Sequence, residues 1–194
     1  MTSPADHSFS AGLQSVWRCE RPTTSRKTSD ENPWIRVRED VAELPDGRTT
    51  IYGVVTCADA VGVLPMLDSE TVILVGQYRY VARAFMWEIP TGGASKGESH
   101  EATAQRELRE EAGYEAERLT ELCIYDTSKS IMDERCWIYL GEGLRPVPAR
   151  PDETEFFEIR AFPFVEVLRM VETSEIKDSM TVVAVLHAAR RFGR

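Results

Sequence analysis

The chain has 194 residues and a net charge of −9 at pH 7, with 42% hydrophobic and 28% charged residues. This length fits one domain, or one domain with an arm, and the apolar content is sufficient for a sizeable core. The negative charge argues against a nonspecific nucleic-acid surface or an anionic-membrane surface. No apolar run approaches the roughly 18 residues of a membrane span, and no signal peptide is recognisable. The four scattered cysteines, without zinc spacing, are typical of reduced thiols in an intracellular protein, so we expect a cytoplasmic location.

The N-terminal region divides into two parts by composition. Residues 1–32 are rich in Ser, Thr, Pro and charge, which predicts a disordered arm. Residues 34–43 alternate between apolar and polar, a turn signal follows at 45–48, and 50–55 is a β-branched run. This pattern predicts a β-hairpin over 33–57. Because its apolar side chains need a cover, we expect this hairpin to form a homodimer.

The remaining residues, 58–194, have the pattern of one α+β domain with a mixed sheet between helices. Residues 142–155 are predicted to be a proline-rich, acidic connection. The final helix is predicted to turn Val182, Val183, Leu186 and Ala189 inward and to end on two arginines, where cations suit the helix dipole. The expected strands are 58–66, 71–76, 121–125, 136–140 and 156–162, and the segment 85–90 leads into the glycine loop. The expected helices follow Ser99 and span 163–172 and 178–191.

The stretch from Gly92 to Tyr114 combines a glycine loop with a short helix. Ser99 is a suitable N-cap, and Gly113 suits the left-handed residue that ends many helices. Between them, one apolar stripe has a spacing of four residues and consists of Ala104, Leu108 and Ala112.

The same helix carries a crowded acidic face. Glu107, Glu110 and Glu111 are spaced at i, i+3 and i+4, and like charges at this spacing repel. A cation should therefore occupy the face. Mg²⁺ prefers oxygen ligands, binds through a few carboxylates plus substrate phosphates, and can activate a bound water. Arg106 is interpreted as an ion-pair partner that orients these carboxylates.

The full pattern of this stretch is G-x5-E-x7-R-E-U-x-E-E-x-G-U, in which U is apolar or aromatic. A chance match at a given start is on the order of 10⁻⁹. The stretch resembles the Nudix box, the signature of hydrolases that cleave a nucleoside diphosphate linked to another group. The resemblance implies the Nudix fold, with a mixed sheet between helices in an α/β/α arrangement.

Flanking motifs resemble the ADP-ribose pyrophosphatase branch of this family. They are Gln77-Tyr78-Arg79 with Trp87-Glu88-Ile89-Pro90, Asp133-Glu134-Arg135, and Ile176-x-Asp178 with Thr181. The resemblance implies hydrolysis of a nucleoside diphosphate sugar, most simply ADP-ribose to AMP and ribose 5-phosphate, with Arg79, Glu88 and Glu134 contacting substrate. Residues 128–132 lack the Pro-Gly pair of many such enzymes, in which this loop helps to shape the substrate pocket. The alternatives are a GDP-mannose or dinucleoside-polyphosphate hydrolase and a nucleotide-sugar binder without turnover.

The resemblance also implies roles for individual residues. Glu107 and Glu111 would be the principal ligands of Mg²⁺, or of Mn²⁺ as an alternative. Glu98, Glu110 and the Thr91 carbonyl would lie at or next to the metal. In the acidic loop 152–155, Glu153 would be the general base and Glu155 an auxiliary ligand, with loop 126–135 as the other possible source of the base. The three histidines, which lack partners at metal spacing, are interpreted as bystanders: His7, His100 and His187.

Overall fold

The structure is a computed structural model that describes residues 25–148 and 158–194. The chain forms two compact units. The first consists of residues up to Cys57 together with Lys129–Asp133, and the second consists of Ala58–Ser128 and Glu134–Arg194. We describe each unit by itself.

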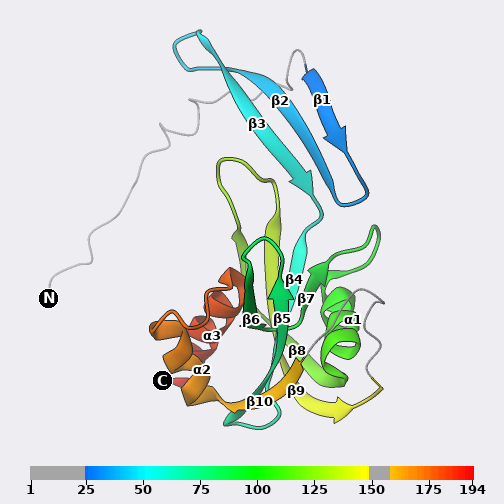
Figure 1. The fold of residues 1–194 in the computed structure, drawn as a ribbon, viewed down its shortest axis with the longest axis vertical. Helices are drawn as coiled ribbons and strands as arrows, with labels where there is room; N and C mark the ends of the chain where they lie inside the picture. Colours follow the sequence, from blue (N-terminus) through cyan, green and yellow to red (C-terminus); the bar gives the residue numbers. More distant parts are fainter. Residues whose placement is uncertain (1–24, 149–157) are drawn as a thin grey trace, which may run out of the picture. The chain divides into compact units, whose positions relative to one another are not determined.

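The N-terminal unit contains an antiparallel sheet in the order β1-β2-β3 (Figure 1). Its strands are β1 (Ser25–Glu31), β2 (Ile35–Glu43) and β3 (Thr49–Cys57). The register of β2 and β3, from Ile35 opposite Cys57 to Glu43 opposite Thr49, confirms the predicted hairpin. Gly47 adopts a φ of 82° in the turn, where glycine is favoured. The expected disordered arm is wrong for residues 25–31, which form β1, and residues 1–24 lie outside the described part.

The segment Lys129–Asp133 adds to this unit through main-chain hydrogen bonds. Val55 donates to the Ile131 carbonyl at 2.7 Å, and the Asp133 amide donates to the Val55 carbonyl at 3.1 Å. The Asp133 carboxylate also accepts from the Thr56 hydroxyl at 2.9 Å and from the Cys57 amide at 3.2 Å. Part of the predicted 126–135 loop therefore belongs to the N-terminal unit, because β3 supplies its hydrogen-bond partners.

The second unit is built on two sheets, in the orders β7-β4-β9-β8 and β10-β5-β6. Strand β4 runs parallel to β9, and the other pairs are antiparallel, so the predicted mixed sheet is confirmed. The strands are β4 (Ala60–Pro65), β5 (Thr71–Arg79), β6 (Ala84–Glu88), β7 (Thr91–Gly93), β8 (Tyr114–Asp126), β9 (Arg135–Pro146) and β10 (Glu158–Pro163).

Three helices cover these strands: α1 (His100–Ala112), α2 (Phe164–Glu172) and α3 (Ser179–Phe192). Figure 1 shows α1 on one side of the strands and α2 and α3 on the other. Two separate cores match this arrangement, since Val61 and Val63 of β4 pack with the α1 core and Leu64 packs with the α2 and α3 core. Alternate residues of one strand thus serve opposite faces, which confirms the α/β/α expectation.

Two details of this unit correct the sequence predictions. Residues 142–146 belong to β9 rather than to a connection, because they pair with the start of β8, from Glu142 opposite Arg118 to Pro146 opposite Tyr114. Leu186 does not face the core: it is 45% exposed, whereas Ala184, Val185 and Ala188 are buried. Among the described residues, no helix is long and apolar enough to cross a bilayer.

Candidate active site

Helix α1 begins and ends at the residues predicted from the sequence. Ser99 accepts from the Ala102 amide, and Gly113 closes the helix with a φ of 71°. The stripe of Ala104, Leu108 and Ala112 is buried against the sheet. Glu107 and Glu111, which are 8% and 4% exposed, are buried beside this stripe. Buried carboxylates need a positive partner or hydrogen-bond donors, so this face of α1 must be matched by cations or donors.

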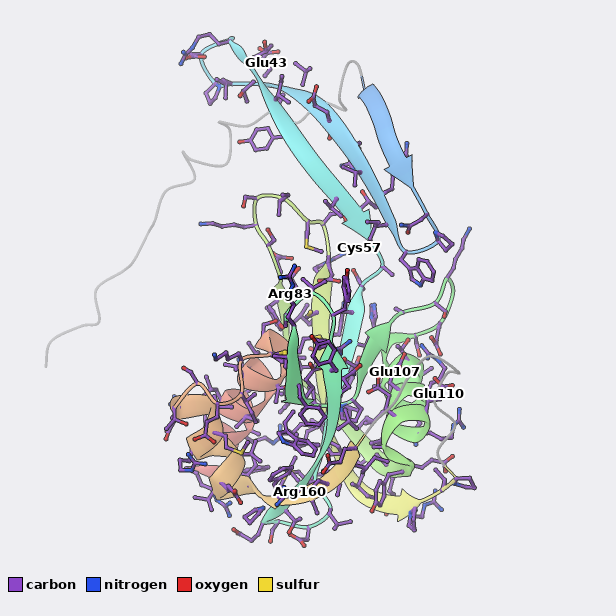
Figure 2. All side chains as sticks on the ribbon, viewed as in Figure 1. Glu43, Cys57, Arg83, Glu107, Glu110 and Arg160 are labelled. Atoms are coloured by element: carbon purple, nitrogen blue, oxygen red, sulfur yellow. The ribbon has the colours of Figure 1, made fainter. Side chains whose placement is uncertain are left out.

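Arg106 is the centre of the acidic cluster. Its Nη1 lies 2.7 Å from Oε1 of Glu107 and 2.9 Å from Oε2 of Glu110. Its Nε lies 3.2 Å from Oε1 of Glu98, and its Nη2 donates to the Gly93 carbonyl at 3.2 Å. Arg106 thus forms ion pairs with three carboxylates, two of which project from α1 in Figure 2. Its orienting role in the reaction stays a prediction.

The contacts between Arg106 and the carboxylates also shift the pKa values of Arg106 and Glu98. Burial alone lowers the pKa of Arg106, but the hydrogen bond that it donates to Glu98 and the charge of Glu107 raise it overall. The hydrogen bond from Arg106 in turn lowers the pKa of Glu98, with smaller help from Thr103 and the Ser95 amide. Both groups therefore stay charged across the neutral range.

The glycine loop of β7 approaches these carboxylates closely. A Cβ placed on Gly92 would lie 1.9 Å from Oε1 of Glu107, so no other residue fits without moving that side chain. The Thr91 amide donates to Oε2 of Glu111 at 3.0 Å. The short strand β7 therefore forms one wall of the site, and α1 forms the other.

The donor set suits a hard divalent cation in both chemistry and charge. Three carboxylates, from Glu98, Glu107 and Glu110, contact the Arg106 guanidinium, and a fourth, from Glu111, accepts from the Thr91 amide. All four offer oxygen atoms. In residues 25–148 and 158–194, no three acidic, histidine or cysteine side chains already converge on one metal-sized point. A cation would compete with Arg106 and the Thr91 amide for these oxygens, and Glu107 and Glu111 would hold it.

Sequence comparison decides the family of this site. The NUDIX domain profile matches residues 57–181, which is more than half of the chain. The chain belongs to the NUDIX family. A second profile, the nucleoside diphosphate sugar hydrolase N-terminal domain, matches residues 19–55. Members of the Nudix family use a divalent metal ion, which agrees with the carboxylate site.

Curated relatives cover most of this Nudix chain. It is 38% identical to the ADP-ribose pyrophosphatase of Bacillus subtilis over 76% of this chain and 80% of the relative. It is 35% identical to the methanol dehydrogenase activator of Bacillus methanolicus, over 78% and 83%. It is 33% identical to the ADP-ribose pyrophosphatase of Mycobacterium tuberculosis, over 84% and 81%. A crystal structure of an ADP compounds hydrolase has the same fold, with a TM-score of 0.78, 23% identity, and coverage of 88% of this chain and 94% of that one.

Arg79 and Glu88, both predicted substrate contacts of the Nudix site, form an ion pair with each other. Nε of Arg79 donates to both carboxylate oxygens of Glu88 at 3.0 Å. Burial raises the pKa of Glu88, while Arg79 opposes that rise and Asp178 adds to it. Glu88 is almost completely buried, whereas the Arg79 side chain is 42% exposed. Arg79 thus keeps an open side, and its contact with substrate stays a prediction.

The motif Ile176-x-Asp178 with Thr181 has a structural role in this Nudix domain. Asp178 is the N-cap of α3 and accepts from both the amide and the hydroxyl of Thr181 at 2.7 Å. The Thr181 hydroxyl accepts from the Ile89 amide at 2.9 Å. Because Ile89 follows Glu88 in the chain, this relay fixes the Arg79–Glu88 pair relative to α3.

The predicted residues on the two other loops are placed only in part. Asp133 is bound to β3 in the N-terminal unit, and the Glu134 carbonyl accepts from the Thr127 amide at 3.4 Å. The role of the Glu134 side chain toward substrate stays a prediction. Glu153 and Glu155 lie in 149–157, outside the described residues, so the general base and auxiliary ligand also stay predictions.

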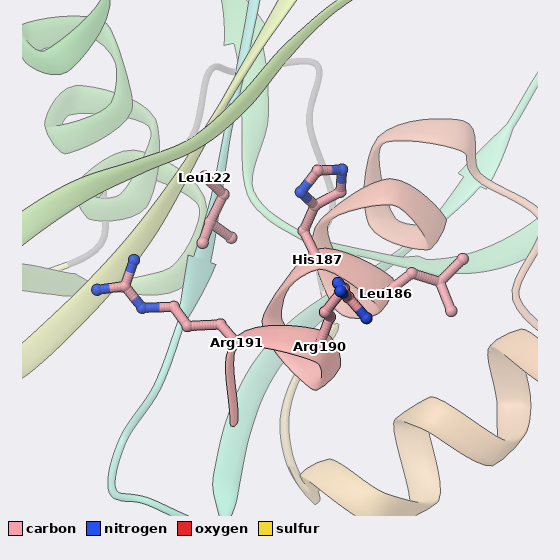
Figure 3. A pocket seen from close by; sticks show the side chains of 5 residues that line it. All are labelled: Leu122, Leu186, His187, Arg190 and Arg191. Atoms are coloured by element: carbon pink, nitrogen blue, oxygen red, sulfur yellow. The ribbon is translucent and has the colours of Figure 1, made fainter. Parts of the chain in front are cut away.

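A hollow of about 520 Å³ lies on α3, on the sheet face opposite α1 (Figure 3). It is lined by Leu122, Leu186, His187, Arg190 and Arg191. The two arginines occupy the last turn of α3, where the helix dipole favours cations as predicted. The position of these arginines at the C-terminal end of α3 accounts for the positive charge of the hollow. The hollow is separate from the carboxylates of the Nudix box.

Proposed function

We propose that the enzyme hydrolyses the diphosphate bond of a nucleoside diphosphate sugar, with ADP-ribose converted to AMP and ribose 5-phosphate. The observation that carries this proposal is the close packing of Gly92 on β7 against the buried carboxylate of Glu107 on α1, beside the buried carboxylate of Glu111. Such buried carboxylates serve metal-assisted phosphate chemistry. The two bacterial relatives named as ADP-ribose pyrophosphatases support this substrate.

Each residue of the site has a separate task in this reaction. Glu107 and Glu111 hold the metal, for which we propose Mg²⁺, and Glu98, Glu110 and the Thr91 carbonyl complete its surroundings. A divalent ion held by these residues would polarise the diphosphate and lower the pKa of a water. Glu153 takes the proton of the attacking water while a new P–O bond forms and the bridging P–O bond breaks. Arg79, Glu88 and Glu134 shape the substrate pocket.

A hydrolysis panel tests the proposal. The full chain is incubated with Mg²⁺ and ADP-ribose, GDP-mannose, a diadenosine polyphosphate or an NTP, and the products are separated by chromatography. We expect AMP and ribose 5-phosphate from ADP-ribose at the highest kcat/KM. A higher kcat/KM for another compound would replace ADP-ribose as the substrate. Tight binding without turnover of any compound would favour a nucleotide-sugar binder.

We also propose that the enzyme acts as a homodimer formed through β2 and β3. Large apolar side chains are exposed on these strands, including Ile51 at 58% and Tyr52 at 41%, and Trp34, just before β2, is 77% exposed. Exposed apolar patches of this kind mark interaction surfaces. Ile51→Glu should shift the chain toward monomer in light scattering, because a charge would be buried at the contact. The matched control is Thr49→Glu, an exposed position at the end of the same strand. A wild-type chain that is monomeric and fully active would refute the proposal.

A further inference from the structure

Three side chains that lie far apart in the sequence meet at the N-terminal end of α1. Asp59 precedes β4, His100 is the first residue of α1, and Trp137 lies in β9. His100 Nε2 lies 3.2 Å from Oδ2 of Asp59, and Trp137 Nε1 donates to the same oxygen at 3.2 Å. The imidazole stacks on the indole with a centroid distance of 4.0 Å and an interplanar angle of 17°. Asp59 and Trp137 lie outside the Nudix box, and His100 occupies one of its unspecified positions.

The chemistry of this cluster fixes the orientation of His100. The carboxylate of Asp59 offers only acceptors, so His100 must carry a proton on Nε2, as the indole does on Nε1. Stacking against Trp137 then holds the ring plane. The His100 and Asp59 side chains are 27% and 24% exposed, so their polar contact adds little to global stability. The contribution of the cluster is therefore geometric.

Asp59 contacts both ends of the loop that leads into α1. Its carbonyl accepts from the Ala94 amide at 2.8 Å, where the pairing of β4 with β7 ends. Its carboxylate holds His100, where the helix begins. The loop 94–100 is thus closed at its base by one residue. No spacing in the sequence links these three positions, so their contact cannot be predicted from the sequence alone.

The closed loop carries Glu98, and it presents this residue to Arg106. The Glu98 amide donates to the Ser95 carbonyl at 3.0 Å, and its carboxylate accepts from the Ser95 amide at 3.3 Å and from Thr103 at 2.9 Å. The same carboxylate holds Arg106, which contacts Glu107 and Glu110. A chain of direct contacts therefore runs through the loop from Asp59 to the carboxylates of the box.

We propose that Asp59, His100 and Trp137 form a latch that holds the loop 94–100 closed and positions Glu98 and Arg106 for binding of a divalent cation. The three are positioning residues, because they act through Glu98 and Arg106 rather than on substrate. The inference rests on the metal role of the box carboxylates within the proposed function.

The test uses His100→Phe in the full chain. Phenylalanine keeps a flat ring on Trp137 but cannot donate to Asp59. In metal-free protein, hydrogen–deuterium exchange at the amides of residues 95–103 should rise, while exchange in α3 stays at the wild-type level. By calorimetry, Mg²⁺ affinity should fall by about tenfold, the lower end of the effect of losing an outer partner of a metal ligand. The matched control is His187→Phe on α3, which should change neither measurement.

Two further variants keep the test decisive. Trp137→Phe removes the indole N–H and keeps an aromatic ring, so it repeats the test if His100→Phe does not fold. In the double variant Asp59→Ala/His100→Phe, the loss of Mg²⁺ binding free energy should be smaller than the sum of the losses in the two single variants, because both changes open the same latch. Wild-type exchange and Mg²⁺ affinity in the folded variant would overturn the proposal. Both readouts omit substrate, so a failure of the proposed nucleotide-sugar activity would leave this test standing.

Discussion

Gly92 on β7 and Glu107 on α1 are packed so closely that a single methyl group cannot fit between them. The Cβ of an alanine at position 92 would lie 1.9 Å from Oε1 of Glu107 and 2.2 Å from its carboxylate carbon. Gly92 is therefore required by this contact rather than by its backbone conformation, since its φ is not in the left-handed range. The relationship explains physically why the box begins with glycine.

Gly92→Ala should reduce kcat by about 10²-fold, because Glu107 must turn away and a metal ligand is displaced. Because only the end of the Glu107 side chain has to move, the loss should appear in activity rather than in the free energy of unfolding. The matched control is Gly93→Ala, one residue later, where the nearest atom to a Cβ would be the Cβ of Ala58 at 3.9 Å. Equal activity of the two variants in steady-state kinetics would contradict the close contact.

Glu111→Gln should preserve the fold and reduce kcat by at least about 10²-fold at saturating Mg²⁺. The amide oxygen of glutamine can still accept from Thr91, whose amide lies 3.0 Å from Oε2 of Glu111, but the charged ligand is lost. Circular dichroism checks the fold, and kinetics checks the loss. Glu101→Gln, an exposed position on the first turn of α1, is the control and should remain active. Near wild-type turnover of Glu111→Gln would remove it from the principal ligands.

Glu153→Gln should reduce kcat by about 10²–10⁴-fold, which is the usual contribution of a general base. Substrate Kd and Mg²⁺ affinity should stay close to wild type, because only proton transfer is removed. Equilibrium binding and single-turnover rates separate the two effects. The comparison variant is Glu134→Gln. A normal rate for Glu153→Gln together with an inactive Glu134→Gln would move the base to the 126–135 loop.

The raised pKa of Glu88 leads us to expect a specific pH dependence of the free energy of unfolding. Burial raises its pKa in the folded state above 4.5, its ordinary value, even though Arg79 opposes the rise. The folded protein therefore binds more protons at this site than the unfolded chain once the pH exceeds about 4.5. The contribution of Glu88 to the free energy of unfolding is fully present below that pH and declines as the pH rises through the folded-state pKa.

Urea unfolding of the wild type and Glu88→Gln between pH 4 and about 7 tests this sign. The difference in unfolding free energy, wild type minus variant, should fall as the pH rises, because only the wild type loses a proton at this position. A difference that grows with pH would mean that Arg79 outweighs burial and holds the pKa of Glu88 low.

The sequence by itself determined the local features of the site. The spacing of Ala104, Leu108 and Ala112 defined the buried stripe of α1, and Ser99 and Gly113 marked its ends. These features depend on neighbours within one or two helical turns, which the sequence lists in order. For the same reason the acidic face, with Arg106 as its cation, could be predicted, as could the strand pattern of the mixed sheet.

Only the tertiary structure decided which distant residues complete this site. The steric role of Gly92, the pairing of Arg79 with Glu88, and the capping relay from Asp178 to Ile89 depend on how separate elements pack. The latch of Asp59, His100 and Trp137 arises because β4 and β9 are adjacent parallel strands beside the start of α1. Periodicity in a sequence specifies which face of an element is buried. It does not specify which residue of another element that face will meet, and that contact gives His100 its partner.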